Sequence, residues 1–171
     1  MVNKSYLVSS SSAIKPLDDK TRLNSDSQLS EELGPDGFTA VAFSHGPDGK
    51  VDVIGTASMK KWKDDSLWRP YDATSQTTNL NQTCVGDFEL AVVALLPGAY
   101  RGQGLAGRLV KLCEEEILRR ERTKSPIRIM IRVSMENNGQ YWLKQGFVPI
   151  GSKACPKGFW GSTQDFTMWA M

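Results

Sequence analysis

The chain has 171 residues, with 21 lysines and arginines against 19 aspartates and glutamates, and 40% of its residues are hydrophobic. A chain of this length and composition buries enough surface to form a core, which excludes a wholly disordered protein. The formal net charge of +2 gives no broad positive field, so nucleic acid is not an expected partner and any anion must be bound locally.

The sequence lacks the usual signals for membranes, export and metal binding. The longest apolar run, residues 90–99, is about half of the roughly 20 residues that a membrane span needs, and the first twelve residues hold only a short apolar patch. We therefore expect a cytoplasmic protein without membrane contact. Three widely spaced cysteines, Cys84, Cys113 and Cys155, predict neither a disulfide framework nor a metal site, and Cys113 is expected in the core.

The first half of the chain is predicted to contain strands joined by polar segments. Residues 1–37 are weakly defined, with a short strand at 6–8 and a weak helical stretch at 18–33. Two β-rich runs, 38–43 and 51–57, flank a turn-rich segment, which predicts a hairpin. A third strand is expected at 88–96, after a polar connection over 63–87 whose length is uncommon in a compact domain.

The second half begins with the most regular pattern. Apolar residues recur at helical spacing over 104–120, which predicts an amphipathic helix, and alternating residues over 127–133 predict a strand. A short helix is expected at 139–145, ending at Gly146, followed by strands at 147–150 and 165–170. This order of elements predicts an α+β, or mixed α/β, fold in a single domain over residues 1–171.

The strongest functional signal lies just before the predicted helix at 104–120, where the sequence RGQGLAG runs from Arg101 to Gly107. Glycines let the backbone approach a phosphate closely, while the unpaired N–H groups and the dipole of the following helix favour a negative charge. The segment therefore predicts an anion-binding bend.

Gly102, Gly104 and Gly107 also satisfy the dinucleotide fingerprint, Gly-x-Gly-x-x-Gly. That fingerprint should open the first strand–helix–strand unit of a domain, whereas here it follows three antiparallel-looking strands. Dinucleotide binding is therefore only a third hypothesis.

The same segment resembles motif A of the GNAT superfamily of N-acetyltransferases, Gln/Arg-x-x-Gly-x-Gly/Ala, through Arg101, Gly104 and Ala106. A second segment, from Asn137 to Phe147, resembles motif B of that family, in which an Asn-led helix ends in a Lys-x-Gly-Phe turn. The two motifs occur in the family's order, and the resemblance covers roughly residues 38–150. It implies a GNAT-like fold: a central, mostly antiparallel sheet that is splayed between two central strands, with flanking helices.

The resemblance implies an N-acetyltransferase that moves an acetyl group from acetyl-CoA to a primary amine by direct attack in a ternary complex, without a metal. The bend would hold the pyrophosphate, and the pantetheine arm would pair with the strand at 88–96, where a backbone N–H can stabilise the oxyanion. The implied cofactor-binding residues are Ala94, Leu95, Leu96, Arg101, Gly102, Gln103, Gly104, Leu105, Ala106, Asn138 and Trp142. Asn138 equally suits a helix cap.

Amine acetylation needs a base for the amine and an acid for the leaving thiolate. Glu89, on the predicted strand, is the first candidate base, although a carboxylate there equally fits an edge position in solvent or an ion pair with an arginine such as Arg128 or Arg132. Glu136 is the second candidate base. Tyr141 is the candidate acid, because a phenol with a pKa near its usual value of about 10 suits protonation of a thiolate. His45, the sole histidine, falls in a predicted turn and is not expected to act as a base.

One departure from the family pattern keeps a second hypothesis open. Many members carry a motif B tyrosine where this chain has Trp142, and neighbouring residues of a helix point about 100° apart, so Tyr141 and Trp142 would not face the same group. The alternative is a non-catalytic acyl-CoA-binding relative that serves as a sensor or interaction module.

Aromatic residues outside the predicted core elements suggest an acceptor site. Trp62, Trp68 and Trp160 would wall such a site, and Trp62 beside Asp64 and Asp65 suits a cationic, partly apolar amine. We therefore expect a small-molecule amine as acceptor and a monomer or homodimer, while the tryptophans equally fit a role as anchors for loops. The basic run at 118–124 fits a solvated helix end, or a contact with the adenosine phosphate.

Overall fold

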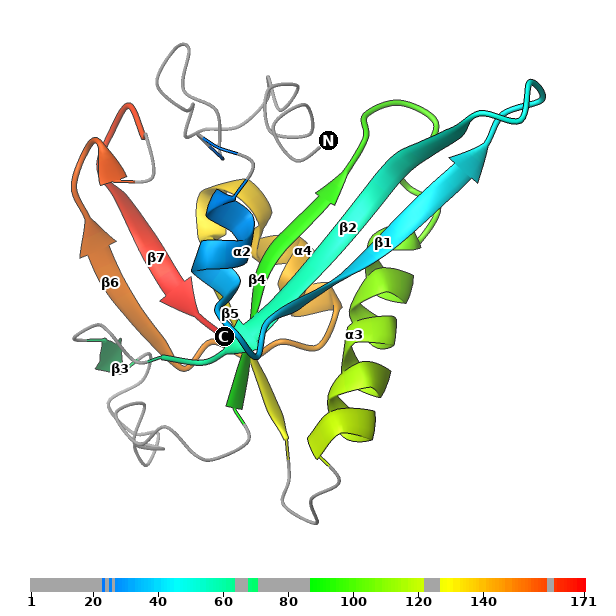
Figure 1. Cartoon of the computed structure of the whole chain (residues 1–171). Coiled ribbons are helices and arrows are strands. Elements are labelled where there is room, and N and C mark those ends of the chain that lie inside the picture. Colours follow the sequence, from blue (N-terminus) through cyan, green and yellow to red (C-terminus); the bar gives the residue numbers. More distant parts are fainter. Residues whose placement is uncertain are drawn as a thin grey trace. The chain divides into compact units, whose positions relative to one another are not determined.

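The computed structural model describes Leu23, Ser25 and residues 27–63, 68–70, 87–121, 127–159 and 162–171. Its elements, labelled as in Figure 1, are α2 (Gln28–Leu33), β1 (Phe38–His45), β2 (Val51–Lys61), β3 (Arg69–Pro70), β4 (Asp87–Leu95), α3 (Leu105–Glu121), β5 (Arg128–Ser134), the π-helix η1 (Met135–Gly139), α4 (Gln140–Lys144), β6 (Gly151–Cys155) and β7 (Phe166–Ala170). The described strands follow the order β1-β2-β4-β5-β7-β6-β3 in one sheet. This is the mixed α/β fold that the element order predicts.

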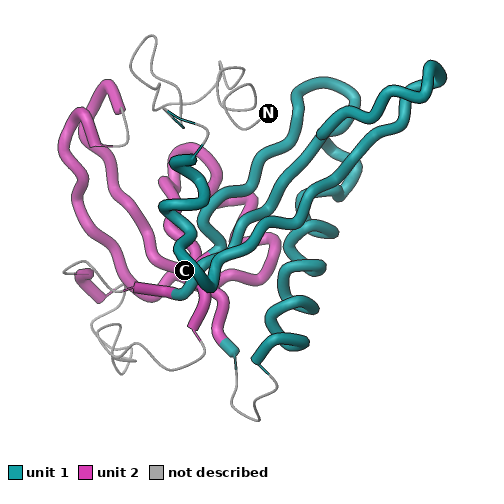
Figure 2. Tube along the Cα trace, viewed as in Figure 1, with its two compact units in different colours: residues 1–9, 21–61, 90–127 teal, residues 10–20, 62–89, 128–171 magenta. Residues whose placement is uncertain are grey.

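The chain divides into two compact units (Figure 2). Among the described elements, unit 1 contains α2, β1, β2, α3 and β4 from Leu90 onward, while unit 2 contains the start of β4 together with β3, β5, η1, α4, β6 and β7. The expected single domain over residues 1–171 stays a prediction. No helix in the described part of the chain is both long enough and apolar enough to cross a membrane.

The hairpin of unit 1 is confirmed, and both of its strands are longer than predicted. β1 and β2 run antiparallel, with Phe38 opposite Met59 and His45 opposite Val51. The turn between them is closed by the Gly46 N–H, which donates to the Lys50 carbonyl at 2.8 Å. Gly49 in the same turn has a φ of 78°, a conformation that glycine adopts without strain.

The predicted amphipathic helix is α3, which packs against the hairpin of unit 1. Its buried residues follow the helical spacing of the sequence pattern: Leu109, Val110, Cys113 and Ile117. β2 contributes Gly55, where a Cβ would lie 2.6 Å from Leu95 Cδ2 and 3.1 Å from Leu109 Cδ1, so a larger residue there would make these leucine side chains shift. Cys113 is fully buried, which confirms its expected place in the core, and burial raises the pKa of its thiol to about 11.

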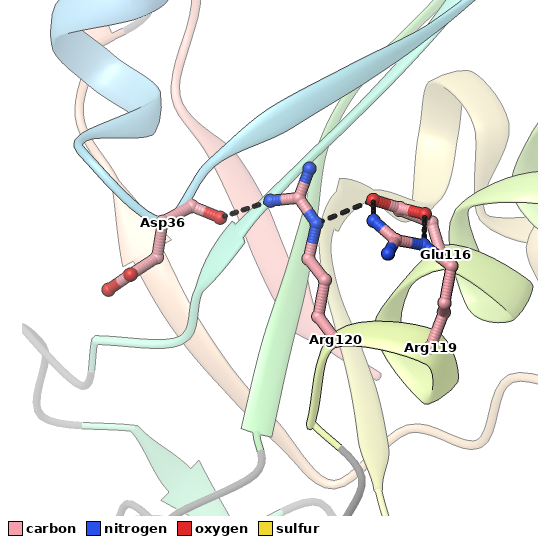
Figure 3. A network of polar contacts seen from close by, with 4 residues as sticks. All are labelled: Asp36, Glu116, Arg119 and Arg120. Carbon is pink, nitrogen blue, oxygen red and sulfur yellow. Dashed lines mark hydrogen bonds and ion pairs between the residues drawn. The ribbon is translucent and has the colours of Figure 1, made fainter.

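The basic end of α3 is tied to its own helix and to the segment before β1 (Figure 3). Glu116 accepts hydrogen bonds from Arg119 and Arg120 at 2.7 Å, and these bonds lower the pKa of its carboxyl to about 2. Arg120 also donates to the Asp36 carbonyl at 3.5 Å and lies 4.3 Å from the ring centre of Phe38. Arg119 and Arg120 therefore form hydrogen bonds within the protein at the end of α3. An adenosine phosphate that bound to them would have to compete with these bonds.

In unit 2 the predicted strand at 147–150 is wrong. The strand begins four residues later, as β6, which pairs antiparallel with β7 on one side and β3 on the other. Pro149 has no N–H to donate to a ladder, whereas the Ile150 N–H bonds the Ala170 carbonyl at 2.9 Å. The sequence of β6, GSKAC, has a low β propensity, so only its two partner strands make it a strand.

The other predictions differ from the structure mainly at their ends. The strands at 88–96, 127–133 and 165–170 are confirmed as β4, β5 and β7. The helix predicted at 18–33 begins at Gln28 among the described residues, and the strand at 6–8 lies outside them. α4 ends before Gly146, whose φ is 90°, as expected, but η1 precedes it directly. Asn138 therefore lies inside a helical turn, and its expected role as the cap is wrong.

Candidate functional site

The bend between β4 and α3 lies entirely in unit 1 and has the conformation that its glycines predict. Gly98, Gly102 and Gly104 have φ angles of 83°, 78° and 72°, a region that side chains with a Cβ rarely adopt. Residues 101–104 are exposed, and a Cβ at any of the three glycines would meet nothing within 4 Å. The bend is therefore an open stretch of main chain.

The main-chain N–H groups of this bend lack acceptors within the protein. The Arg101 N–H donates to the Gly98 carbonyl, and the Arg108 N–H donates to the Gly104 carbonyl, each at 3.1 Å. Between these two bonds, the N–H groups of residues 102–107 donate to no group in the described part of the chain. They include the first N–H groups of α3, which no helix can satisfy by itself.

The charges along this segment suit an anion. The first turn of α3 contains no acidic residue, so the positive end of the helix dipole is not neutralised. Three exposed basic side chains occur in the bend or in the first two turns of the following helix: Arg101, Arg108 and Lys111. Unpaired N–H groups, a helix dipole and exposed cations together fit a phosphate or diphosphate.

The strand before the bend presents the other residues expected to contact the cofactor. Ala94 is buried and packs with Val92 in a cluster that includes Leu23 and Leu29, whereas Leu95 and Leu96 are partly exposed. The Leu96 N–H donates to the Ile54 carbonyl of β2 at 2.9 Å, so this amide already has a partner. Their contacts with the cofactor stay predictions.

Motif B lies in unit 2, where its two aromatic residues differ in exposure. Trp142 is buried and packs edge to face against Phe147, with ring centres 5.4 Å apart, and against Tyr141 at 4.9 Å. Tyr141 is 40% exposed, and partial burial raises the pKa of its phenol. The two side chains therefore have different surroundings, as the helical geometry predicts, and Trp142 has the position of a core residue.

The first candidate base, Glu89, is a buried carboxylate paired with an arginine. Its Oε1 lies 3.6 Å from Arg132 Nε, and the two side chains are 6% and 12% exposed. This is the ion pair that the sequence left open as the alternative, while a role as base stays a prediction. The second candidate, Glu136, is exposed at the start of η1 and accepts a hydrogen bond from the Ser134 hydroxyl at 2.7 Å.

A second carboxylate–arginine pair lies close by on the same two strands. Arg128 donates through Nε to Asp87 Oδ1 at 2.8 Å and through Nη2 to Asp87 Oδ2 at 2.5 Å. The Asp87 side chain is 1% exposed, and its carbonyl accepts the Trp62 N–H at 3.0 Å. Asp87 is not among the residues expected from the sequence, although two acids on one predicted strand and two arginines on another, Asp-x-Glu and Arg-x-x-x-Arg, were available as a signal.

The tryptophans expected at an acceptor site lie in the core of unit 2 where they are described. Trp62 and Trp68 are 4% and 9% exposed, belong to the buried cluster with Met130 and Met168, and have ring centres 6.5 Å apart. Their burial fits residues that anchor neighbouring loops on the core, which was the alternative interpretation of these tryptophans. Trp160, Asp64 and Asp65 lie outside the described residues.

No cluster of three or more histidine, cysteine or acidic side chains suited to a metal ion occurs among the described residues. His45 is exposed at the end of β1, in the hairpin of unit 1. The thiols of the two described cysteines, Cys113 and Cys155, are buried and unpaired with each other, and burial raises the pKa of both.

Comparison with known proteins places the fold. No protein-family model and no curated protein match the sequence. NAA60 of Arabidopsis thaliana, solved in complex with a bisubstrate analogue, is 13% identical, with 87% of this chain and 83% of NAA60 covered and a TM-score of 0.54. A GNAT-family protein of Desulfovibrio desulfuricans is 14% identical, with 78% and 68% covered and a TM-score of 0.43. Nourseothricin acetyltransferase is 18% identical, with 80% and 65% covered and a TM-score of 0.41.

At such identities a likeness concerns the fold and not the chemistry. The alignment with NAA60 covers most of both chains. The chain has a mixed α/β fold, and this fold is similar to that of NAA60.

Proposed function

We propose that the protein is an N-acetyltransferase that uses acetyl-CoA and transfers the acetyl group to a small-molecule primary amine. The observation that carries the proposal is the bend before α3, where the N–H groups of residues 102–107 have no acceptor in the described part of the chain. The fold supports the same conclusion, because NAA60, which shares it, binds a bisubstrate analogue.

In this proposal the bend holds the diphosphate of the cofactor through its main chain. The N–H groups of residues 102–107 donate to the phosphate oxygens, the dipole of α3 adds a favourable charge, and the glycines keep side chains out of the way. The pantetheine amides pair with the backbone of β4 near Ala94 to Leu96. Among the motif B candidates, Asn138 is exposed and able to contact a ligand, whereas Trp142 is in the core.

The bound cofactor supplies an activated thioester, and the chain's own groups have to manage the protons. The acceptor amine must lose a proton, so Glu89 acts as the base, directly or through water, with Glu136 as the second candidate. The departing thiolate must gain a proton, and the phenol of Tyr141, a group that is protonated at neutral pH, is the candidate donor. A backbone N–H stabilises the charge that develops on the thioester oxygen.

The test combines binding with turnover. Acetyl-CoA is titrated into the purified protein by calorimetry, and release of free thiol is then followed over a panel of small amines, aminoglycosides and peptides. The proposal predicts saturable binding, with thiol release that depends on one class of amine. Absence of acetyl-CoA binding, or tighter binding of NAD than of CoA, contradicts it.

Two glycines of matched geometry separate the role of the bend from backbone strain. Gly102 and Gly49 both have a φ of 78°, and a Cβ at either would meet nothing within 4 Å. Alanine at either position therefore carries a similar strain of about 1–2 kcal/mol. We expect Gly102→Ala to weaken acetyl-CoA binding and Gly49→Ala to leave it unchanged, at equal losses of stability. Equal binding by both variants contradicts the proposed site.

One observation supports a second candidate function, a non-catalytic acyl-CoA-binding module. Trp142 occupies the position of the family's motif B tyrosine and is buried in the core, and the neighbouring Tyr141 lies partly exposed. Saturable acetyl-CoA binding without thiol release from any amine would favour this candidate. We further propose a cytoplasmic location and a monomer or homodimer, which fractionation and light scattering would test.

A further inference from the structure

We infer that Arg132 is a positioning residue, whose positive charge beside the buried carboxylate of Glu89 keeps that carboxylate ionised. This inference rests on the proposed function, since it concerns the candidate base of that reaction. All of the contacts that carry it lie within unit 2.

Arg132 is held by three different parts of unit 2. Its guanidinium carbon lies 4.7 Å from the ring centre of Trp62, its Nη2 donates to the Lys63 carbonyl at 2.7 Å, and its Nε lies 3.6 Å from Glu89 Oε1. A planar guanidinium can stack on an aromatic face while its edges donate in fixed directions, which an ammonium group cannot do. The side chain is therefore fixed before any ligand binds.

The burial of Glu89 makes such a partner necessary. The carboxylate is 6% exposed, and a carboxylate taken out of water without a partner takes up a proton. A protonated carboxyl cannot accept a proton from an amine or a water molecule. The positive charge of Arg132 offsets the cost of burial, so Glu89 stays charged and available as a base.

Two other charged groups on the same strands, Asp87 and Arg128, form an ion pair with each other. Asp87 lies two residues before Glu89 on β4 and accepts hydrogen bonds from two nitrogens of Arg128. Arg128 lies four residues before Arg132 on the strand β5. The Asp87–Arg128 pair thus provides a control within the same strands, because it also joins a buried carboxylate to an arginine, here a more exposed one, but does not include the candidate base.

The first experiment measures the ionisation of Glu89 and needs no activity. The carboxyl ¹³C signal of Glu89 is assigned by its loss in Glu89→Gln and is followed in the full chain at neutral pH. We expect the signal of a carboxylate in the unaltered protein and in Arg128→Met, and that of a protonated carboxyl in Arg132→Met. A carboxylate signal that is the same in Arg132→Met overturns the inference, even if the protein has no transferase activity.

The second experiment uses turnover with the best amine of the panel. Since a positioned base contributes about 10²–10⁴-fold to a rate, we expect Arg132→Ala to lower kcat by about 10-fold or more, with acetyl-CoA affinity within about 3-fold. Arg128→Met should lose stability and keep kcat. Guanidinium chloride at concentrations that do not unfold the protein should restore part of the kcat of Arg132→Ala, whereas sodium chloride should not.

The outcomes separate this inference from the proposed function. If acetyl-CoA binds and thiol is released, but Arg132→Ala keeps the full kcat or Glu89→Gln is fully active, the inference fails while the function stands. If thiol is never released, the function fails and the carboxyl signal still decides the role of Arg132. Should Arg132→Ala not fold, Arg132→Gln is used, which removes the charge but keeps much of the side chain, and a full kcat in that variant overturns the inference.

Discussion

The bend of unit 1 and the aromatic core of unit 2 are built in opposite ways. In the bend, residues 101–104 are exposed, the main-chain N–H groups of residues 102–107 lack acceptors in the described residues, and the glycines leave open space where side chains would be. In unit 2 the chemically interesting side chains are packed: Glu89 pairs with Arg132, and Trp62, Trp68 and Trp142 are buried.

This difference shows where function can be inferred from the chain. An open main-chain site is specified by conformation, so glycines and a helix start are enough to predict it from sequence. A packed side chain is specified by its neighbours, so a tryptophan or glutamate in the sequence does not reveal whether it binds a ligand or fills the core. The predictions below test each side of this comparison.

The largest effect is expected from removing a packed aromatic residue of unit 2. Trp142→Ala should cost about 3–5 kcal/mol of unfolding free energy, because it deletes a buried indole that packs against Phe147. Tyr141→Phe, which changes the exposed neighbour by one hydroxyl, should cost less than about 1 kcal/mol. Urea unfolding measures both. Equal losses would contradict the assignment of Trp142 to the core.

The second prediction concerns the interior of unit 1, at a buried position of the helix that follows the open bend. Raising the pKa of the Cys113 thiol from 9.0 to about 11 lowers its thiolate fraction at pH 8 about 100-fold, and burial reduces access further. Iodoacetamide should therefore label Cys113 at least that much more slowly in the folded protein than in urea, as read by peptide mass spectrometry. Rapid labelling in the folded state would mean that the reagent reaches the Cys113 thiol, and would contradict its burial in the interior of unit 1.

A negative charge in the bend should weaken binding without weakening the fold. Gln103→Glu places a carboxylate beside the N–H groups of the α3 start, which favours the helix by about 0.3–1 kcal/mol but repels a diphosphate. We expect acetyl-CoA affinity to fall about 10-fold at low salt and less at high salt. Gln103→Met, which removes the side-chain bond to the Ala99 carbonyl without adding charge, is the control. Equal affinities of the two variants would argue against an anion site.

The smallest effect is expected at the exposed network of Figure 3. The pKa of Glu116 is lower in the folded chain, at about 2, than its ordinary value of 4.5, because Arg119 and Arg120 donate to its carboxylate. Its contribution to stability is therefore complete above about pH 4.5 and is lost as the pH falls towards 2. Glu116→Gln should unfold with a weaker dependence on pH in this window. Solvent screening keeps the effect small, and an unchanged pH dependence would contradict the pairing.

Features set by the local sequence could be predicted, whereas features set by packed neighbours could not. The hairpin, α3, β5, the open bend and the buried Cys113 depend on local patterns, and each was predictable. The position of β6 was not, since GSKAC becomes a strand only between β7 and β3. The π-helix before α4 shows no distinct signal in the sequence MENNG. For Glu89 the sequence offered two arginines as partners, and only the fold pairs it with Arg132 and leaves Arg128 to Asp87.

The most direct test of the account is an amide NMR titration of the bend. The backbone ¹⁵N–¹H signals of residues 102–107 are followed as acetyl-CoA is added, and acetyl-pantetheine, which has the same thioester but no diphosphate, is the control ligand. The account predicts saturable shifts of these amides with acetyl-CoA and much smaller shifts with acetyl-pantetheine. Unchanged signals at these residues in the presence of bound acetyl-CoA would contradict it.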